Sequence, residues 1–172
     1  PAPTPDAAAF HVKLRAAAQK YGIELADVGA GICHQLVLER GKALPGYLAI
    51  GTDSHSVSYG AVGAFGTSMG ATEAAIALMT GQVWLRVPQS IRVYLKGSLQ
   101  PGVSGKDVAL QLLKITGEAG GDYMALEFAG PGVASLSVAD RIAMCIMAVE
   151  SSAKAALFPP DAVTKEWLAM RG

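Results

Sequence analysis

Charge and cysteine are both scarce in this sequence of 172 residues, and their scarcity excludes several classes of protein. Charged residues make up 16% of the chain, and its 14 basic and 14 acidic side chains cancel to a formal net charge of zero. No basic run is present, so nothing supports nucleic acid or an anionic membrane as a partner. The two cysteines, Cys33 and Cys145, form no C-x-x-C motif, so we expect no disulfide framework and a reducing, cytoplasmic environment.

Long apolar runs are missing as well. The longest weakly polar stretch, residues 61–81, contains Glu73 and several glycines, which argues against a membrane span. Residues 1–5 lack the basic and apolar parts of a signal peptide, and their alternating prolines predict extended chain, as in the middle of a longer polypeptide. Hydrophobic residues make up 51%, so the low charge indicates either a surface partly covered by other protein or plain alanine and glycine richness.

The sequence does contain an alternation of helix and strand patterns. Cap residues and apolar spacing predict helices over residues 7–20, 62–67, 71–80, 108–115, 137–149 and 161–170. Buried or alternating apolar runs predict strands over residues 47–50, 90–96, 123–128 and 154–158, and residues 23–28 are expected to be extended. This alternation predicts a layered α/β fold. The joint at residues 81–88 divides it into residues 1–86, with the active-site loops, and a second small α/β domain, residues 87–172.

A polar run follows the predicted strand at residues 47–50. It reads Gly51-Thr52-Asp53-Ser54-His55, and the carboxyl end of a buried strand is where α/β proteins place ligand chemistry. From residue types alone the run is either such a site or a structural turn in which Asp53 and Ser54 bond backbone amides. A Ser–His–Asp hydrolase is the least favoured alternative, because adjacent residues cannot form that relay and no Gly-x-Ser-x-Gly motif occurs.

Other polar side chains stand in apolar surroundings. His34 interrupts an apolar run, and Glu150 follows the uncharged residues 142–149, whereas His11 fits the surface of a helix. Glu150 is either a surface residue beyond the core or a buried group with a partner. The histidines with Asp53 or Glu150 would supply three zinc ligands, but nothing in the spacing requires zinc, and we assign no metal ligand.

Motifs spread over nearly the whole chain resemble the aconitase superfamily in order and spacing. They are Gly31-Ile32-Cys33-His34-Gln35, Leu44-Pro45-Gly46, Gly51-Thr52-Asp53-Ser54-His55, Gly60-Ala61-Val62-Gly63, Trp84-Leu85-Arg86-Val87-Pro88, Lys106-Asp107, Met144-Cys145 up to Glu150, and Phe158-Pro159-Pro160-Asp161. The stretch from Trp84 to Pro88 is most similar to the large subunits of 3-isopropylmalate dehydratase and homoaconitase. The resemblance implies an aconitase-like fold of α/β/α layers with a mixed sheet.

The resemblance also implies a chemistry. The family holds a [4Fe–4S] cluster through three cysteines, and the open iron acts as a Lewis acid on the substrate. The substrate would be a hydroxy di- or tricarboxylate such as 3-isopropylmalate or homocitrate/homoaconitate, which loses water and regains it at the neighbouring carbon. Carried over, the catalytic residues are His34 paired with Asp53, His55 paired with Glu150, and Ser54 as a hydrogen-bonding group in the same pocket. Each carboxylate would fix the tautomer of its imidazole.

The chain departs from the family pattern at several points. The family's cluster cysteines lie downstream of this region, and Cys33 and Cys145 do not match them. The upstream Asp–His pair, and the serine and arginines of the swivelling domain, are also outside the matched region, and Ile146 stands where the family usually has Asn. We therefore expect the chain to be inactive alone and to need the remaining large-subunit domains and a small swivel subunit or domain. The alternative is a non-catalytic aconitase-like domain for binding or assembly.

Overall fold

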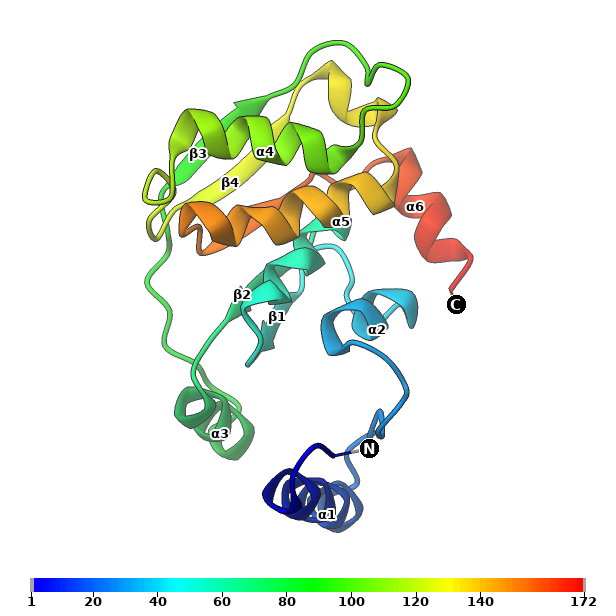
Figure 1. The fold of residues 1–172 in the computed structure, drawn as a ribbon, viewed down its shortest axis with the longest axis vertical. Helices are drawn as coiled ribbons and strands as arrows, with labels where there is room; N and C mark the ends of the chain where they lie inside the picture. Colours follow the sequence, from blue (N-terminus) through cyan, green and yellow to red (C-terminus); the bar gives the residue numbers. More distant parts are fainter. Residues whose placement is uncertain (1, 172) are drawn as a thin grey trace.

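Two parallel β-sheets carry the fold, and the computed structural model describes them within residues 2–171 (Figure 1). Pro1, the first residue of the expected extended start, and Gly172 lie outside the described residues. One sheet pairs β1 (Leu48–Gly51) with β2 (Phe65–Ser68), and the other has the order β3 (Ser90–Tyr94), β4 (Ala125–Ala129), β5 (Ala155–Leu157). Every pairing in these two sheets is parallel, and the antiparallel bridge between Asp122 and Ala153 is isolated. The predicted α/β class is confirmed. A mixed sheet was expected, and the antiparallel pairing found in the described residues is the bridge between Asp122 and Ala153.

Helices connect the strands and cover the sheets. In chain order they are α1 (Pro5–Tyr21), α2 (Cys33–Glu39), the 3₁₀ helix η1 (Ser54–Val62), α3 (Ala71–Thr80), α4 (Gly105–Thr116), η2 (Pro131–Ser135), α5 (Val138–Met147), η3 (Ala148–Ser151) and α6 (Ala162–Ala169). Figure 1 shows α4 and α5 side by side across one face of the three-stranded sheet, and α5 also packs against η1. The helices α1 and α3 lie at the far end of the molecule from that sheet.

Capping side chains explain where the helices of the second half begin, with α5 and α6 within one residue of their predicted starts and α4 three residues before its own. Ser137 and Asp140 form a capping box at the start of α5, and an equivalent box caps α4. Asp161 accepts a hydrogen bond from the backbone N–H of Thr164 at 3.0 Å at the start of α6. These local contacts satisfy backbone donors that the helix itself leaves free, so the start of each helix is fixed by its own sequence.

The first helix begins two residues before its predicted start. Thr4 caps α1 by accepting from the backbone N–H of Ala7 at 3.2 Å, so Pro5 already lies in the first helical turn. The run at residues 32–38 folds into α2, while residues 23–28 form neither helix nor strand.

The helix predicted over residues 62–67 is wrong. There η1 ends at Gly63, which has a φ of 82°, and the chain then forms β2, which pairs with β1. A Cβ at Gly66 would lie 2.3 Å from the carbonyl oxygen of Ser56, so β2 lies against η1 at a distance that only glycine permits. The glycine at this position therefore reflects close packing between elements, which local helix propensity does not reveal.

One hydrophobic core links the two sheets. The rings of Phe128 and Phe158 stack at 4.3 Å between centroids, and Leu38 of α2 and Val62 of η1 belong to the same buried cluster. The helices α1 and α3, in contrast, bury none of their residues. The core therefore holds η1 rigidly against β5 and α5, and η1 is the element that carries the polar run described below.

The predicted boundary between residues 1–86 and 87–172 falls within residues 82–89, a stretch with neither helix nor strand. The core cluster contains residues from both sides of this boundary. The division into two domains therefore stays a prediction, which limited proteolysis within residues 82–89 would test. None of the helices within residues 2–171 is long and apolar enough to cross a membrane.

Candidate functional site

The polar run at the end of β1 is positioned by the start of η1. Asp53 is the N-cap residue of η1, and its carboxylate accepts a hydrogen bond from the backbone N–H of His55 at 2.7 Å. The hydroxyl of Ser56 donates to the backbone oxygen of Asp53 at 2.7 Å and closes the turn. His34 arrives from a different element, the first turn of α2. The polar run therefore does form a structural turn, in which Asp53 bonds a backbone amide. The same turn leaves the Asp53 carboxylate facing His34 on α2.

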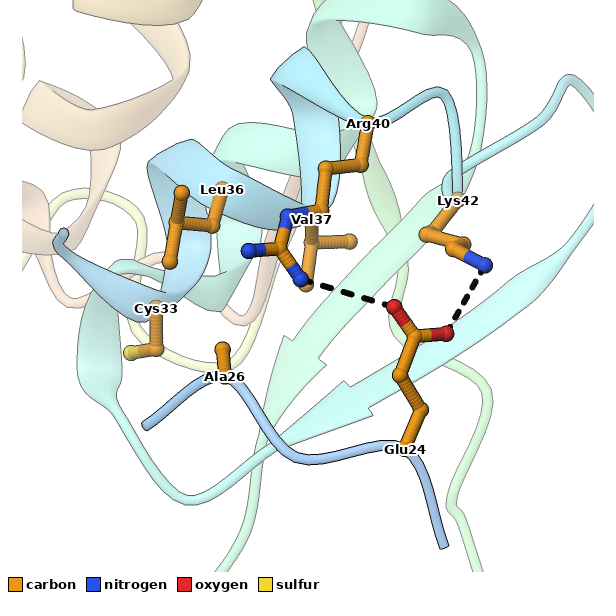
Figure 2. A pocket seen from close by; sticks show the side chains of 7 residues that line it. All are labelled: Glu24, Ala26, Cys33, Leu36, Val37, Arg40 and Lys42. Carbon is orange, nitrogen blue, oxygen red and sulfur yellow. Dashed lines mark hydrogen bonds and ion pairs between the residues drawn. The ribbon is translucent and has the colours of Figure 1, made fainter. Parts of the chain in front are cut away.

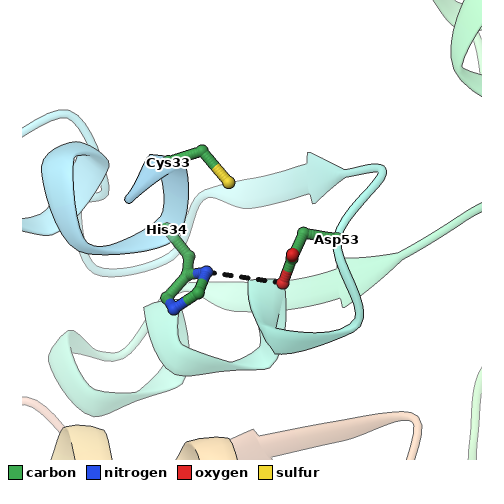
Figure 3. Close-up of side chains that lie close together, drawn as sticks. All are labelled: Cys33, His34 and Asp53. Atoms are coloured by element: carbon green, nitrogen blue, oxygen red, sulfur yellow. Dashed lines mark ion pairs between the residues drawn. The ribbon is translucent and has the colours of Figure 1, made fainter. Parts of the chain in front are cut away.

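Asp53 lies between the two histidines. Its Oδ1 atom is 3.4 Å from Nδ1 of His34 and 3.2 Å from Nδ1 of His55. The two imidazole rings are 5.4 Å apart between centroids and tilted by 37°. Figure 3 shows the Asp53 carboxylate on the loop after β1 facing the His34 ring on α2. The expected pairing of His34 with Asp53 is therefore present as a close contact, and His55 joins the same carboxylate.

The environment of the three side chains differs. The side chain of His34 is 13% exposed, against 41% for Asp53 and 38% for His55. The hydrogen bond from the His55 backbone N–H lowers the pKa of the Asp53 carboxyl, and the two imidazoles act in the same direction. Asp53 is consequently ionised at neutral pH. The Nδ1 atom of His34 is buried and makes no hydrogen bond, because its approach to Asp53 lacks hydrogen-bond geometry.

Ser54 and Glu150, the other two predicted catalytic residues, differ in their relation to the cluster of Asp53 and the two histidines. The hydroxyl of Ser54 lies 3.4 Å from Nδ1 of His55, so Ser54 belongs to the cluster. Glu150 is exposed on η3 and, within residues 2–171, has no hydrogen-bond or ion-pair partner. The implied pairing of His55 with Glu150 is thus not found among the described residues, where Nδ1 of His55 faces Asp53, two residues away in the same turn.

Cys33 and Tyr59 join the site although neither was assigned a role from the sequence. One donor atom each from Cys33, His34 and Asp53 lie within 4.8 Å of one another. Burial raises the pKa of the Tyr59 hydroxyl, and the nearby Cys33 and Asp53 add to this effect. The adjacency of Cys33 to His34 was the available signal, but it required knowing that α2 begins at Cys33 and turns both side chains toward η1.

A cavity of about 250 Å³ also has Cys33 in its lining (Figure 2). Its lining residues are Glu24, Ala26, Cys33, Leu36, Val37, Arg40 and Lys42. Both cations already face the Glu24 carboxylate, with Lys42 at 2.9 Å and Arg40 at 3.4 Å. The hydrogen bond from Lys42 is the main cause of the lowered pKa of Glu24. The lining therefore carries a formal charge of +1, from two cations and one carboxylate, and both cations are already engaged with Glu24.

The cysteines of this chain do not fit a [4Fe–4S] cluster. Cys33 is exposed, whereas Cys145 is buried and its thiol donates to the backbone oxygen of Ala156 at 3.6 Å. Burial raises the pKa of the Cys145 thiol, so it resists the deprotonation that iron binding needs. A cluster of this type takes three or four thiolates, and the sequence contains two cysteines at separate places.

Comparison with known proteins places nearly the whole chain in one group. Residues 5–172 match the family described as "Aconitase family (aconitate hydratase)". The chain is 42% identical over 168 residues to the 3-isopropylmalate dehydratase large subunit of Methanoregula boonei, covering 98% of this chain and 40% of that protein. It is 48% identical over 145 residues to the probable methanogen homoaconitase large subunit of Methanosarcina mazei, covering 84% and 37%.

A third relative is the homoaconitase large subunit of Thermus thermophilus, which is 43% identical over 162 residues. This alignment covers 94% of the chain and 39% of the relative. The chain thus spans about two fifths of the length of the curated relatives that it matches.

Proposed function

This chain belongs to the aconitase family, and on that premise we propose that it forms the histidine–carboxylate side of a hydro-lyase active site. The proposed substrate is a hydroxy di- or tricarboxylate such as 3-isopropylmalate or homocitrate/homoaconitate, in line with the names of the relatives. The observation that carries the proposal is the single carboxylate oxygen of Asp53 facing Nδ1 of both His34 and His55, at 3.4 and 3.2 Å.

Asp53 acts in this proposal as a positioning residue. An ionised carboxylate beside Nδ1 favours the tautomer in which Nδ1 carries the proton, which leaves Nε2 of the same ring as the atom that meets the substrate. The backbone N–H of His55 holds the carboxylate in place, so its orientation does not depend on the substrate. The lowered pKa of Asp53 keeps it ionised throughout the range in which histidine changes its charge.

His55 is the proposed proton donor and His34 the group that holds water. Dehydration breaks a C–O bond, and a proton from the imidazolium of His55 converts the leaving hydroxide to water. The exposure of His55 suits contact with a substrate, and the burial of His34 suits a fixed role. Ser54 would add a hydrogen bond beside His55. The proton on the neighbouring carbon needs a base, which we assign to a part of the enzyme outside this chain.

Glu150 stays in the proposal as a second acidic residue of the site. It lies on η3, and η3 packs against η1, the element that carries His55. Its side chain is exposed and unengaged among the described residues, so it is free to change rotamer when a substrate or another domain arrives. The expected result is that Glu150→Gln lowers turnover of the assembled enzyme.

The proposed partners are the remaining large-subunit domains and a small swivel subunit or domain. These parts would supply the cluster thiolates, which give Lewis-acid chemistry in the family, and the residues that bind the substrate carboxylates. The exposed apolar side chains of α1 and α3 support a covered surface. Phe10 is 67% exposed, and Leu78 and Met79 are 80% and 86% exposed. Such side chains gathered on two helices are typical of a surface that packs against other protein.

A non-catalytic aconitase-like domain for binding or assembly is the alternative. Ile146, in place of the family's usual Asn, and the missing thiolates favour it. Against it stands the cost of keeping the nitrogen of His34 buried without a hydrogen bond, about 1–3 kcal/mol, which a purely structural domain has no reason to retain. Turnover separates the two functions. The hydro-lyase proposal predicts turnover once the enzyme is assembled, whereas the binding-domain alternative predicts none in any assembled form.

The experiment is a chimera in which residues 5–172 replace the matching segment of the Methanoregula boonei large subunit, assayed with its small subunit on 3-isopropylmalate. We expect turnover, and we expect His55→Asn to lower kcat by about 10²–10⁴-fold because a proton donor is lost. The matched control is His11→Asn, which changes a histidine on α1 and should leave kcat unchanged. A chimera that carries its cluster and yet gives no turnover, with or without Ile146→Asn, would favour the binding domain.

A further inference from the structure

We propose that Cys33, His34 and Asp53 form a site for one divalent ion of the zinc and cobalt class. One donor atom from each residue lies within 4.8 Å of the other two. The residues come from two elements, the start of α2 and the loop before η1, and Figure 3 shows the thiol, imidazole and carboxylate gathered around one space. This site is different from an iron–sulfur site. It shares His34 and Asp53 with the hydro-lyase site proposed above, so the bound ion and the catalytic arrangement of these two residues exclude one another, and ion binding is tested separately from turnover.

The unpartnered nitrogen of His34 points to a missing ligand. Its Nδ1 atom is buried and makes no hydrogen bond to the protein, although the Asp53 carboxylate is only 3.4 Å away. Buried polar atoms in folded proteins are nearly always satisfied, and an exception calls for an explanation such as an unseen ion. A cation between the imidazole nitrogen and the carboxylate would satisfy both, with His34 binding it in the tautomer whose proton lies on Nε2, the reverse of the tautomer that Asp53 favours when no ion is bound.

The Asp53 carboxylate is already oriented for binding. Its Oδ1 atom accepts from the backbone N–H of His55 at 2.7 Å and lies 3.2 Å from the ring of the same residue. Hydrogen bonds of this kind to a liganding carboxylate fix its direction and are a regular part of metal sites in proteins. His55 therefore serves as the supporting residue, and the three ligands are Cys33, His34 and Asp53.

The donor set selects the class of ion. One sulfur, one nitrogen and one oxygen suit zinc and cobalt, whereas magnesium and calcium take oxygen ligands almost alone. A tetrahedral site places its donor atoms about 3.3–3.8 Å apart, given metal–ligand distances of about 2.0–2.3 Å. The His34–Asp53 distance already meets this range, and the exposed Cys33 side chain can move toward them by rotation. Three protein ligands leave the fourth position for water.

Binding changes the protonation of one ligand and the oxidation state of none. The S–H bond of Cys33 breaks, its proton passes to the solvent, and the thiolate forms a coordinate bond to the ion. His34 binds as the neutral imidazole, and Asp53 is already ionised at neutral pH. Binding should therefore release the proton of the Cys33 thiol, which the dependence of the binding enthalpy on the buffer measures.

The experiment titrates the 172-residue chain, first freed of metal, with Co²⁺ and then with Zn²⁺. We expect one equivalent of Co²⁺ to produce the near-ultraviolet charge-transfer absorption of a cobalt–thiolate bond, and Zn²⁺ to displace it. Cys33→Ser should abolish the absorption, and His34→Gln should weaken binding by about 10–100-fold or more. The matched controls are Cys145→Ala and His11→Gln, which change the other cysteine and a distant histidine and should have no effect.

A second measurement needs no variant and so does not depend on how the variants fold. Cys33 is exposed and Cys145 is buried, so alkylation of the native chain reports on Cys33. Saturating Zn²⁺ should slow this alkylation strongly. Unchanged alkylation in the presence of Zn²⁺, or cobalt absorption that survives Cys33→Ser, would overturn the proposed site.

Discussion

Two bidentate arginine–aspartate pairs with nearly the same hydrogen-bond distances stand in different parts of the molecule. In the sheet core, which we define as residues 90–171, Arg141 donates to the two oxygens of Asp161 at 2.9 and 2.7 Å. In the peripheral segment, residues 5–28, Arg15 donates to both oxygens of Asp27 at 2.8 Å. The Arg141 side chain is fully buried, whereas those of Arg15 and Asp27 are 48% and 51% exposed.

The difference between the pairs is one of surroundings. Around Arg141 the guanidinium also donates to Thr164 and to the backbone oxygen of Val133, within a packed core. Around Arg15 the helix α1 buries none of its residues. An exposed pair gains little because water screens both charges, whereas removing one partner of a buried pair leaves an uncompensated charge. Geometry alone therefore does not tell which pair holds the fold together.

The largest expected effect comes from truncating a core side chain. Leu126 on β4 is 1% exposed, and Leu126→Ala should lower the free energy of unfolding by about 3–4 kcal/mol through lost burial and a cavity. The matched change is Leu78→Ala on α3, where the side chain is 80% exposed and the change should stay within about 0.5 kcal/mol. Urea unfolding measures both, and equal effects would remove the contrast between the two regions.

The next effect separates the two ion pairs. Asp161→Asn keeps the N-cap of α6 but leaves Arg141 buried without its counter-charge, so it should cost about 3 kcal/mol of unfolding free energy. This value lies at the lower end of the range for buried pairs, because the Asp161 side chain is 27% exposed. Asp27→Asn in the peripheral pair should produce no measurable change. A comparable loss in both variants would show that pair geometry, and not burial, sets the energy.

A smaller effect appears as pH dependence. The hydrogen bond from Arg141 lowers the pKa of Asp161 below its unfolded value of about 3.9. Between these two pKa values the unfolded chain binds more protons, so the contribution of the pair is complete above pH of about 4 and is lost as the pH falls further. Unfolding measured in this acid range should show a shallower decline of stability in Asp161→Asn than in the wild type. Identical slopes would contradict the assignment.

The sequence predicts those parts of the fold that local contacts determine. The helices α4, α5 and α6 follow from Ser and Asp at their starts, and β1 follows from the apolar run before Gly51. The stretch from Gly60 to Ser68 was not predictable in this way. A Cβ at Gly60 would lie 1.6 Å from the backbone oxygen of Ala156, so its glycine is required by a strand almost a hundred residues later in the chain.

In the site, too, the sequence predicts the local contacts but not the tertiary ones. Asp53 and His55 share one turn, so their contact is local, and the resemblance supplied His34 as the third member. Cys33 was not assigned to the site because its position depends on where α2 begins. The N-cap residue of α2 is Ile32, which makes no capping hydrogen bond, so the sequence gives no sign of that start. The Glu150 pairing depends on how η3 lies against η1, a tertiary relation, and there this structure gives His55 a nearer carboxylate.

The most direct test of the shared carboxylate compares two aspartates in the chimeric enzyme described above. Asp53→Asn should lower kcat by at least about 100-fold with little change in KM, because both imidazoles lose the group that fixes their tautomers. Asp27→Asn, the same substitution at an exposed ion pair, should leave kcat unchanged. If Asp53→Asn retains wild-type turnover in an enzyme that folds and carries its cluster, the proposed role of the Asp53 site is wrong.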